Sequence, residues 1–465
     1  MSRPGQNDCG LRTTDCGLRI ADCGLIAEIV SSNPQSAIRN PQSNVSYSLF
    51  VLALLLCTQF IYAFARDDYP RNAAIDAIHY RLRLMIRETS EEIQAEAEIL
   101  FELKEDGVKT IALDLRGLTV VQVTEDKRAA KFTRADGRVQ ISLSGSYRNL
   151  GMVKREGADL ELYYYLFPRD RDKGIKGYGR ALQMIEFYSN LIGPFPYEKL
   201  ALVQSSTRYG GMENASNIFL AEDTFGEGVV AHEIAHQWFG DAVTEADWHH
   251  LWLSEGFATY FGHLFFERAD GRDKFVQLML NDKESYLKEY GKDPPPIYDP
   301  SITDLLKLLN ANSYQKGGWV LHMLRYVMGD EKFFAGIRDY YRTYRDRNAL
   351  TDDFRKVMEF HYGQPLAWFF KQWIFESGYP IYEAVWKWDE STRELRIRVR
   401  QKQEKTVFRM PVEIEIKAGK EVRREVIKID EREQNFTFKL DAKPQGLTID
   451  PDEWLLKVAN VSEVK

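Results

Sequence analysis

The sequence predicts a multi-domain α+β protein: an N-terminal β-sheet domain, a mainly α-helical domain and a C-terminal β-sandwich. Three observations support this prediction. Apolar and polar residues alternate with a period of two before residue 124, helical periodicity dominates residues 227–375, and alternation returns after residue 380. The chain has 465 residues, 44% apolar and 28% charged, so it can bury cores in roughly two to four domains.

Residues 1–45 are predicted to be a repetitive low-complexity leader outside the fold. Asp-Cys-Gly-Leu recurs at a spacing of seven from Asp8, Asp15 and Asp22, and Asn-Pro-Gln-Ser recurs from Asn33 and Asn40. Metal motifs use closer cysteine pairs than this. We therefore interpret the repeat as low complexity rather than as a metal or disulfide site.

Residues 46–65 are predicted to be a signal peptide. The apolar run that starts at Leu49 is short for a membrane span and ends in Ala63-Phe64-Ala65, a pattern typical of signal-peptidase sites. We expect export to the periplasm or secretion, with only transient membrane contact, and anchoring by an uncleaved segment is the alternative. Cleavage after Ala65 leaves no cysteine, so no thiol can act as a nucleophile or ligand.

Residues 66–150 are predicted to form a partial N-terminal β domain. Period-two alternation within residues 79–123 indicates half-buried antiparallel strands at Tyr80–Ile86, Ala95–Leu103 and Ile111–Leu115. Residues 124–176 are polar and contain glycines, and within them only Leu160–Leu166 predicts a strand.

Residues 151–377 are predicted to form the helical domain and residues 378–465 the β-sandwich. One strand at Leu200–Gln204 and a turn at Gly210-Gly211 precede most of the helices. Helical patterns occupy Gly177–Ile192, Val229–Phe239, Glu255–Glu267, Gly317–Val327 and Pro365–Ile374. In the sandwich, alternation indicates strands at Leu395–Val399, Val412–Ile416 and Phe436–Leu440.

The charge of the chain argues against nucleic acid as a partner. The net charge is −7 and the pI is about 5.8, and the sequence has neither a basic run nor a Gly-rich phosphate loop. We expect no nucleic-acid partner, and the oligomeric state stays unknown.

A metal site is predicted at His232-Glu233-Ile234-Ala235-His236. On a helix, residues i and i+4 share a face, so both imidazoles can reach one ion while Glu233 takes a proton from water. Glu255 follows His236 after 18 intervening residues and supplies a third ligand. Two histidines and one carboxylate suit zinc and leave a coordination position open for water, so we expect one Zn²⁺ per chain.

The other histidines are predicted to have structural roles. His249 and His250 are neighbours in sequence and do not share a helix face, so we interpret them as loop residues rather than ligands. His263, His322 and His361 have no motif around them.

Four motifs in order resemble the M1 family of zinc aminopeptidases, which includes leukotriene A4 hydrolase. They are Gly210-Gly211-Met212-Glu213-Asn214, His232–Asp241, Trp252–Ala258 and Tyr314-Gln315-Lys316-Gly317. The first is similar to the family's GxMEN exopeptidase motif and the last to its catalytic tyrosine segment. The resemblance extends loosely over the chain from His79-Tyr80 to Ile449-Asp450-Pro451 and implies a thermolysin-like catalytic domain.

The resemblance also implies roles for these residues. His232, His236 and Glu255 would hold zinc, Glu233 would be general base and then proton donor, and Tyr314 would stabilise the oxyanion. Glu213 would bind the free α-ammonium group of a peptide substrate, which limits removal to one residue. Gly210, Gly211, Met212 and Asn214 would line the substrate.

Some features depart from the family pattern. His250 and Ser254 replace an acidic residue and an asparagine, which would change the support of the metal ligands. Between Val123 and Gly177 we find neither the family's second amine-binding segment nor its Arg/Pro/Asp-rich stretch, so the N-terminal domain looks truncated. Two alternatives to an aminopeptidase therefore stay open: a zinc endopeptidase or related hydrolase without strict N-terminal specificity, and a catalytically inactive zinc-binding remnant.

Overall fold

A computed structural model describes residues 72, 74–86, 93–105, 108–115, 119–125, 128–135, 137–144 and 160–464. The predicted leader and signal peptide lie outside these residues. The described chain divides into two compact units, an N-terminal one that ends at residue 144 and one that starts at residue 160. Within the described ranges, helices are all too short or too polar to traverse a bilayer.

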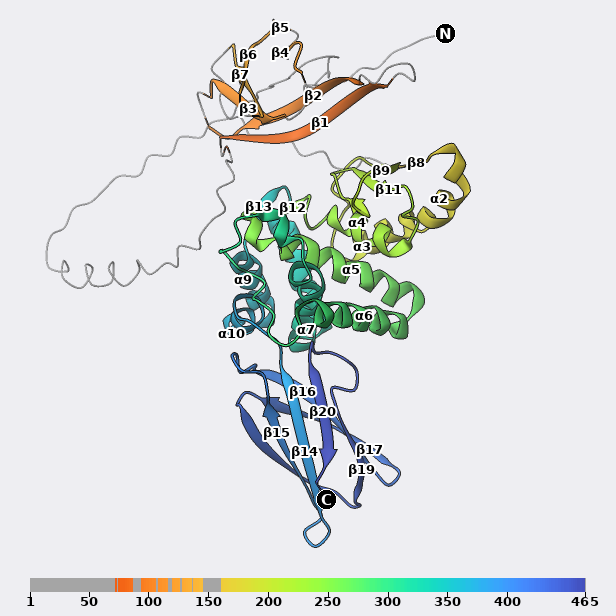
Figure 1. The fold of residues 1–465 in the computed structure, drawn as a ribbon, viewed down its shortest axis with the longest axis vertical. Coiled ribbons are helices and arrows are strands. Elements are labelled where there is room, and N and C mark those ends of the chain that lie inside the picture. The colour runs from red at the N-terminus through yellow and green to blue at the C-terminus, as the bar shows by residue number, and fades with distance from the viewer. Residues whose placement is uncertain are drawn as a thin grey trace, which may run out of the picture. The chain divides into compact units, whose positions relative to one another are not determined.

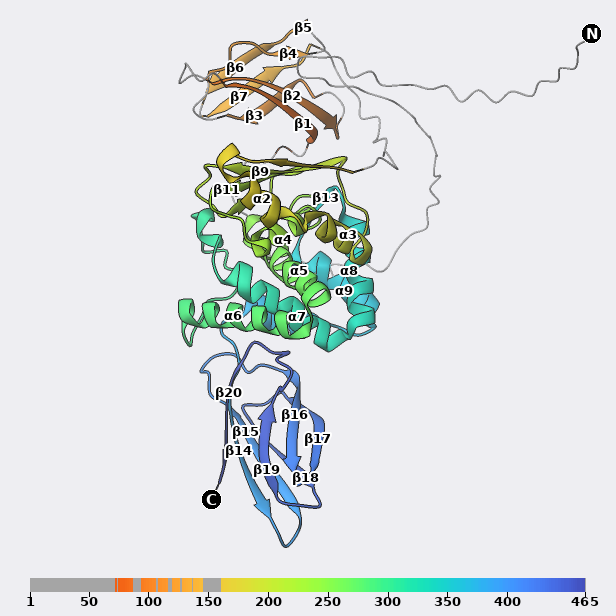
Figure 2. The ribbon, with the colours of Figure 1, turned by 90° about the vertical axis from the view of Figure 1, so that its right-hand side faces the viewer.

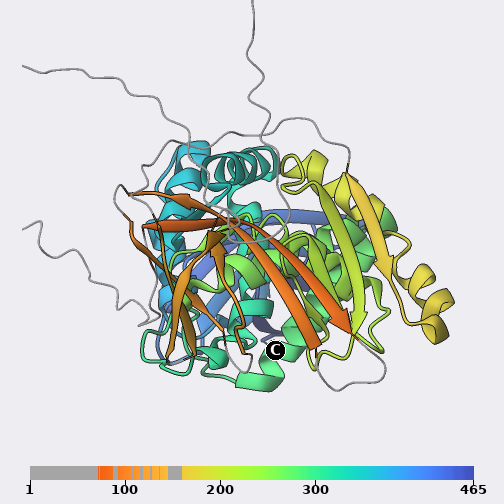
Figure 3. The same ribbon diagram turned by 90° about the horizontal axis from the view of Figure 1, so that it is seen from above.

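The N-terminal unit is built from antiparallel strands. The long strands β1 (Ile75–Ile86) and β2 (Ile93–Leu103) pair with each other and are the two long orange strands of Figure 3. A second sheet has the order β3-β7-β6, from β3 (Thr110–Asp114), β6 (Lys131–Ala135) and β7 (Arg138–Ser142). The short strands β4 (Thr124–Glu125) and β5 (Arg128–Ala129) form a separate pair. The core of this unit contains Ile99, Phe101, Ile111, Val139 and Ile141.

The strands of this unit continue further than the sequence analysis predicted. We expected strands to end near Val123, whereas β4–β7 lie between residues 124 and 142. The expectation failed because β6 is polar and mostly exposed, and its pairing with β7 supplies the order that its own sequence lacks. β7 does alternate, with Val139 and Ile141 buried and their neighbours in the strand more exposed.

The second unit begins with a four-stranded sheet of order β10-β11-β9-β8. β8 (Glu161–Tyr165) and β11 (Asn217–Ala221) both run parallel to the central β9 (Lys199–Ser205), and β10 (Gly211–Met212) pairs antiparallel with β11 at the edge. The predicted turn at Gly210-Gly211 therefore leads into a short edge strand. In Figures 1 and 2, β9 and β11 lie above α3 and α4.

Helices build the rest of this domain, as the periodicity predicted. Their buried aromatic and aliphatic side chains form one core that includes Trp238, Trp252 and Trp319. The helices are α2 (Arg171–Tyr178), α3 (Ala181–Leu191), α4 (Glu227–His236), α5 (Trp252–Asp270), α6 (Arg272–Tyr290), α7 (Gly317–Met328), α8 (Asp330–Tyr344), α9 (Thr351–Tyr362) and α10 (Ala367–Phe370).

Shorter elements join these helices. They are the 3₁₀ turns η1 (Pro168–Asp170), η2 (Trp248–His250) and η3 (Leu305–Leu308), the π-helical turns η4 (Asn312–Lys316) and η5 (Lys371–Phe375), and a parallel pair of β12 (Val243–Glu245) with β13 (Arg347–Ala349). The predicted helix Pro365–Ile374 is therefore α10 followed by η5.

The chain ends in the predicted β-sandwich. One sheet has the order β18-β15-β14-β20 and the other β17-β16-β19. Buried residues alternate along β15 and β16, so the two inner faces make the core. The strands are β14 (Ile381–Asp389), β15 (Glu394–Gln401), β16 (Met410–Ala418), β17 (Glu421–Ile429), β18 (Glu433–Lys439), β19 (Pro444–Ile449) and β20 (Val458–Glu463).

The loop between β19 and β20 joins the sandwich to the helices. The Trp454 ring stacks on His322 of α7, with 4.5 Å between ring centroids. Glu453 forms an ion pair of 3.1 Å with Lys283 of α6, and its carbonyl oxygen lies 3.2 Å from Nε2 of His322. The sandwich and the helical domain therefore share aromatic and ionic contacts.

Candidate metal centre

The helix α4 presents the first two candidate ligands. It begins at Glu227 and ends at His236, so His232 and His236 lie one turn apart near its C-terminal end. Val230, Ala231, Ile234 and Ala235 are buried and anchor the helix in the core. The Nε2 atoms of the two histidines are 3.0 Å apart.

The third candidate ligand comes from α5, which packs against α4. The Oε2 atom of Glu255 lies 3.2 Å from Nε2 of His232 and 3.1 Å from Nε2 of His236. The three side chains form the one cluster of histidine, cysteine, aspartate and glutamate among the described residues that could hold a metal ion.

The geometry and chemistry of this triangle fit zinc. Ligand atoms at about 2.0–2.1 Å from a tetrahedral Zn²⁺ lie about 3.3 Å from one another. The three distances of 3.0–3.2 Å are close to that value. A neutral nitrogen pair with one carboxylate is a donor set that zinc prefers and that leaves room for a fourth ligand.

Neighbouring groups fix the orientation of the His236 ring. Its Nδ1 lies 3.1 Å from the carbonyl oxygen of Phe239 and 3.2 Å from Oγ of Ser254. A proton on Nδ1 donated to Phe239 leaves Nε2 as the lone pair that faces the metal position. Ser254, which stands where the resembling family has asparagine, thus still contacts the ligand ring.

The electrostatics of the triangle favour a carboxylate at Glu255. Burial by itself raises the pKa of Glu255, but the charges and hydrogen bonds of His236 and His232 outweigh burial and hold that pKa well below its usual value. Burial has the opposite effect on His236, yet the Glu255 charge raises the pKa of that imidazole. The Glu255 carboxylate supplies the negative charge that complements a divalent cation.

Glu233 lies beside the ligands and packs against the edge strand β10. It is buried, and a Cβ atom added at Gly211 would lie 2.2 Å from its Oε1. Only glycine at residue 211 therefore leaves space for this carboxylate. Burial raises the pKa of Glu233, and its Oε2 has no hydrogen-bond partner among the described residues. Glu233 is thus a carboxylate poised to take up a proton.

Tyr314 reaches the same site from the π-helical turn η4. Its hydroxyl donates a 2.6 Å hydrogen bond to Oε1 of Glu255, and its ring stacks on His232 at 5.8 Å between centroids. Burial, followed by the Glu255 charge, raises the pKa of Tyr314, so the phenol keeps its proton and remains a donor.

Glu213 lies in the loop between β10 and β11. After burial and closer charges, its negative charge adds to the raised pKa of His236, Glu233 and Tyr314. Gly210, Met212 and Asn214 are exposed, and Gly211 and Glu213 are half-buried. Of the five residues of the motif, Gly211 is the one whose backbone packs against Glu233.

Sequence reasoning missed one residue of this region. Gln237, which directly follows His236, is fully buried, and its side chain holds the loop that carries Glu213. Its Nε2 donates to the Glu213 carbonyl at 2.8 Å and its Oε1 accepts from the Ser216 N–H at 2.8 Å. Gln237 lies within the motif His232–Asp241, but a single glutamine gives no periodic signal, so its role could not be predicted from the sequence.

The other five histidines between residues 160 and 464 contact other groups. His249 lies between Asp247 and the carbonyl oxygen of Ile302, at 2.9 Å from each. His250 lies 2.7 Å from Oγ1 of Thr351, and burial lowers its pKa to about 4. His263 and His361 pair with aspartates, and His322 packs on Trp454.

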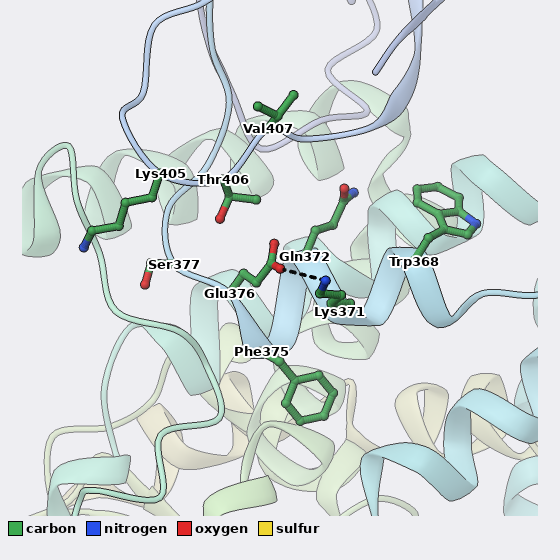
Figure 4. A pocket seen from close by; sticks show the side chains of 9 residues that line it. All are labelled: Trp368, Lys371, Gln372, Phe375, Glu376, Ser377, Lys405, Thr406 and Val407. Atoms are coloured by element: carbon green, nitrogen blue, oxygen red, sulfur yellow. Dashed lines mark ion pairs between the residues drawn. The ribbon is translucent and has the colours of Figure 1, made fainter. Parts of the chain in front are cut away.

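A hollow of about 680 Å³ lies away from this site (Figure 4). Trp368, Lys371 and Gln372 line it from the helical side, and Lys405, Thr406 and Val407 line it from the sandwich side. Lys371 pairs with Glu376 at 3.5 Å. The hollow is open and is lined by none of the candidate ligands. We therefore place the candidate site at His232, His236 and Glu255.

The chain is similar in sequence to known peptidases. Residues 177–373 match the peptidase family M1 domain. The chain is 29% identical over 289 residues to probable aminopeptidase 2 of Sulfurisphaera tokodaii, which covers 58% of this chain and 37% of that protein. It is 30% identical over 248 residues to aminopeptidase M1-C of Oryza sativa subsp. japonica, which covers 49% of this chain and 28% of that protein. The chain thus spans well under half the length of these relatives.

Solved structures share the fold. Aminopeptidase A of Legionella pneumophila, in complex with aspartic acid, has a TM-score of 0.58 at 16% identity, over 76% of this chain and 43% of that one. The M1 zinc metallopeptidase of Deinococcus radiodurans has a TM-score of 0.52 at 19% identity, over 65% of this chain and 93% of that one. The predicted fold class is confirmed.

Proposed function

Because residues 177–373 belong to peptidase family M1, we propose that the protein is a zinc aminopeptidase that hydrolyses residues from the free N-terminus of peptides. One observation carries the proposal. The ligand atoms of His232, His236 and Glu255 lie within 3.2 Å of one another, and a buried glutamate and a hydrogen-bonding tyrosine flank them.

Zn²⁺ held by these three side chains would act as a Lewis acid that lowers the pKa of the attacking water. His236 is kept in the right tautomer for this role by the Phe239 carbonyl and Ser254. No cysteine lies between residues 72 and 464, so this set of ligands contains no thiolate.

Glu233 would act as the general base. The carboxylate is buried, stands between the ligands and Gly211, and has one oxygen without a partner among the described residues. Burial has already raised its pKa, which brings the proton affinity of the carboxylate closer to what proton transfer at neutral pH requires. The same proton would then pass to the leaving amine.

Tyr314 would supply a hydrogen-bond donor and Glu213 a negative charge. The Tyr314 phenol carries its proton and can turn from Glu255 towards the oxyanion of the tetrahedral intermediate. The Glu213 carboxylate would pair with the substrate α-ammonium group. The open edge of β10 offers backbone groups at Gly211 and Met212 to an extended substrate.

The experiment compares two substrates. Purified protein loaded with zinc is incubated with a free-amine aminoacyl reporter and with its N-acetylated form, and Glu233→Gln serves as the matched inactive control. Cleavage of the free-amine reporter alone supports the proposal. We expect at least a tenfold preference, because the acetylated reporter leaves the half-buried Glu213 carboxylate without a partner.

Other outcomes decide between the alternatives. Comparable cleavage of the N-acetylated reporter, or cleavage inside a blocked peptide, identifies an endopeptidase or related hydrolase. Folded, zinc-loaded protein that cleaves neither substrate is an inactive remnant. If the folded protein takes up no zinc, the proposed metal site at His232, His236 and Glu255 is wrong.

We also propose that the protein is exported, with residues 46–65 as the signal segment. The apolar run and Ala63-Phe64-Ala65 support this proposal. Expression with and without residues 46–65, followed by fractionation and N-terminal sequencing, tests it. A cytoplasmic full-length product that begins before residue 46 would contradict it.

A further inference from the structure

Gln237 joins the candidate metal helix to the loop that carries Glu213. The residue caps the C-terminal end of α4, and its side chain is fully buried. Both ends of its amide are used: the oxygen accepts from the Ser216 N–H and the nitrogen donates to the Glu213 carbonyl, each at 2.8 Å. A buried amide with both partners satisfied holds its neighbours in one arrangement.

The loop that Gln237 holds needs such support. It is closed by a hydrogen bond of 2.8 Å from the Asn217 N–H to the Asn214 carbonyl. Ser216 has a φ of +63°, a left-handed conformation that costs energy for any residue with a Cβ atom. This conformation sets the direction of the Ser216 N–H, which is the group that donates to Gln237.

Gln237 also follows the candidate ligand His236 directly in sequence. The path from the His236 ring to the Glu213 backbone therefore runs through one peptide bond and one side chain. A short path of this kind fixes the separation between the scissile bond and the amine anchor, and that separation determines how many residues are removed.

We propose that Gln237 is a positioning residue that sets the exopeptidase register of the site by locking Glu213 relative to the metal helix. This inference rests on the proposed function, because it assigns the amine anchor to Glu213. Without the clamp, the Glu213 loop would relax from its left-handed turn, while His232, His236 and Glu255 would keep their own contacts.

Gln372 is a matched control within the same chain. It is also a buried glutamine, and its amide also bridges backbone groups, with the Arg409 N–H at 2.9 Å and the Arg409 carbonyl at 3.1 Å. It lies in η5, outside the metal centre. Gln372→Ala thus removes an equivalent pair of hydrogen bonds without touching the Glu213 loop.

The test measures binding in a background that does not turn over. Glu233→Gln protein loaded with zinc is titrated calorimetrically with a free-amine dipeptide and with its N-acetylated form, with and without Gln237→Ala. Gln237→Ala should weaken free-amine binding about tenfold or more, because the loop that carries Glu213 loses both hydrogen bonds that hold it. Binding of the acetylated dipeptide and the zinc content should stay unchanged in this variant. Gln372→Ala should leave the binding of both dipeptides and the zinc content unchanged.

A second variant covers the case in which Gln237→Ala does not fold. Gln237→Met keeps the length and apolar volume of the side chain but loses both the acceptor for Ser216 and the donor to Glu213, so the preference for the free amine should fall while the fold is kept. In the active enzyme, both variants should raise KM for the free-amine reporter more than they lower kcat.

The two hypotheses fail in different ways. Full preference for the free amine in both Gln237 variants overturns the positioning role and leaves the aminopeptidase proposal intact. No preference in the parent Glu233→Gln protein overturns the aminopeptidase proposal, and with it the register that Gln237 was inferred to set. Equal losses in the Gln237 and Gln372 variants also overturn the positioning role.

Discussion

The hydroxyl of Tyr314 donates a 2.6 Å hydrogen bond to Oε1 of Glu255, while Oε2 of the same carboxylate faces both histidines. The tyrosine therefore contacts the candidate metal ligand that lies nearest to it along the chain. This bond places a protonated phenol beside the metal position before any substrate binds.

Tyr314→Phe should keep zinc and lose activity. The substitution removes the donor and retains the ring stacked on His232, so kcat should fall about 10²–10³-fold, the usual cost of one oxyanion donor. Steady-state kinetics and metal analysis check this. Tyr286→Phe is the control, because the buried Tyr286 hydroxyl has no hydrogen-bond partner among the described residues. A rise in KM at constant kcat would instead mean that Tyr314 binds the substrate ground state.

Glu233→Gln should also bind one zinc per chain, with turnover reduced about 10²–10⁴-fold. The amide has the shape of the carboxylate and keeps the packing against Gly211, but it cannot take a proton at neutral pH. Stopped assays with metal content measured on the same sample test this. Near wild-type rates would show that another group is the base.

Lys316→Met should stabilise the protein at neutral pH. The Lys316 Nζ is buried and has no partner among the described residues, and burial lowers its pKa from 10.5 to about 7. The unfolded chain therefore binds more protons than the folded one between pH 7 and pH 10.5. Wild-type stability should rise with pH across this window, by at most about 1.4 kcal/mol per pH unit from this group. Above pH 10.5 the amine is unprotonated in both states and costs no stability. The cost is complete once the pH has fallen to about 7.

Urea unfolding of wild type and Lys316→Met at pH 7, 8 and 9 checks this prediction. The variant should be more stable at pH 7, and the difference should shrink as the pH rises. Parallel pH dependences in the two proteins would show that Lys316 is not a buried amine with a lowered pKa.

Trp454→Ala should loosen the junction between the sandwich and the helices. Trp454 stacks on His322 and Tyr326, and the Arg272 guanidinium lies 4.8 Å from the centre of its ring. Loss of these contacts should lower the free energy of unfolding by about 2–4 kcal/mol. Trp388→Ala, in the same sandwich but outside the junction, should cost less in denaturant unfolding. Equal losses would contradict the role assigned to Trp454.

The fold class and the three candidate ligands could be predicted because each rests on a repeating pattern. The period of the helix places His232 and His236 on one face, and alternation marks the strands of the sandwich. Only the resemblance to a family pointed to Tyr314, because a π-helical turn has no recognisable pattern in the sequence. Gln237 needed the folded loop, since its two partners belong to residues 213 and 216.

The missed strands show a different limit. β6 is mostly exposed, and Phe132 is its single large apolar side chain, so its sequence shows no alternation. A signal was present nevertheless: Asp136-Gly137 is a dipeptide typical of hairpin turns, and Val139 and Ile141 alternate after it. Gly137 adopts a φ of +74°, as such a turn requires.

The π-helical turn at Asn312–Lys316 has a consequence for how this site can change. The Lys316 N–H bonds to the carbonyl of Ala311, five residues earlier, so the turn holds one residue more than an α-helix would. Deleting one residue between 312 and 314 would restore ordinary winding and carry the phenol about 100° around the axis. We expect such a deletion to break the Tyr314–Glu255 hydrogen bond while the buried core of the domain stays in place.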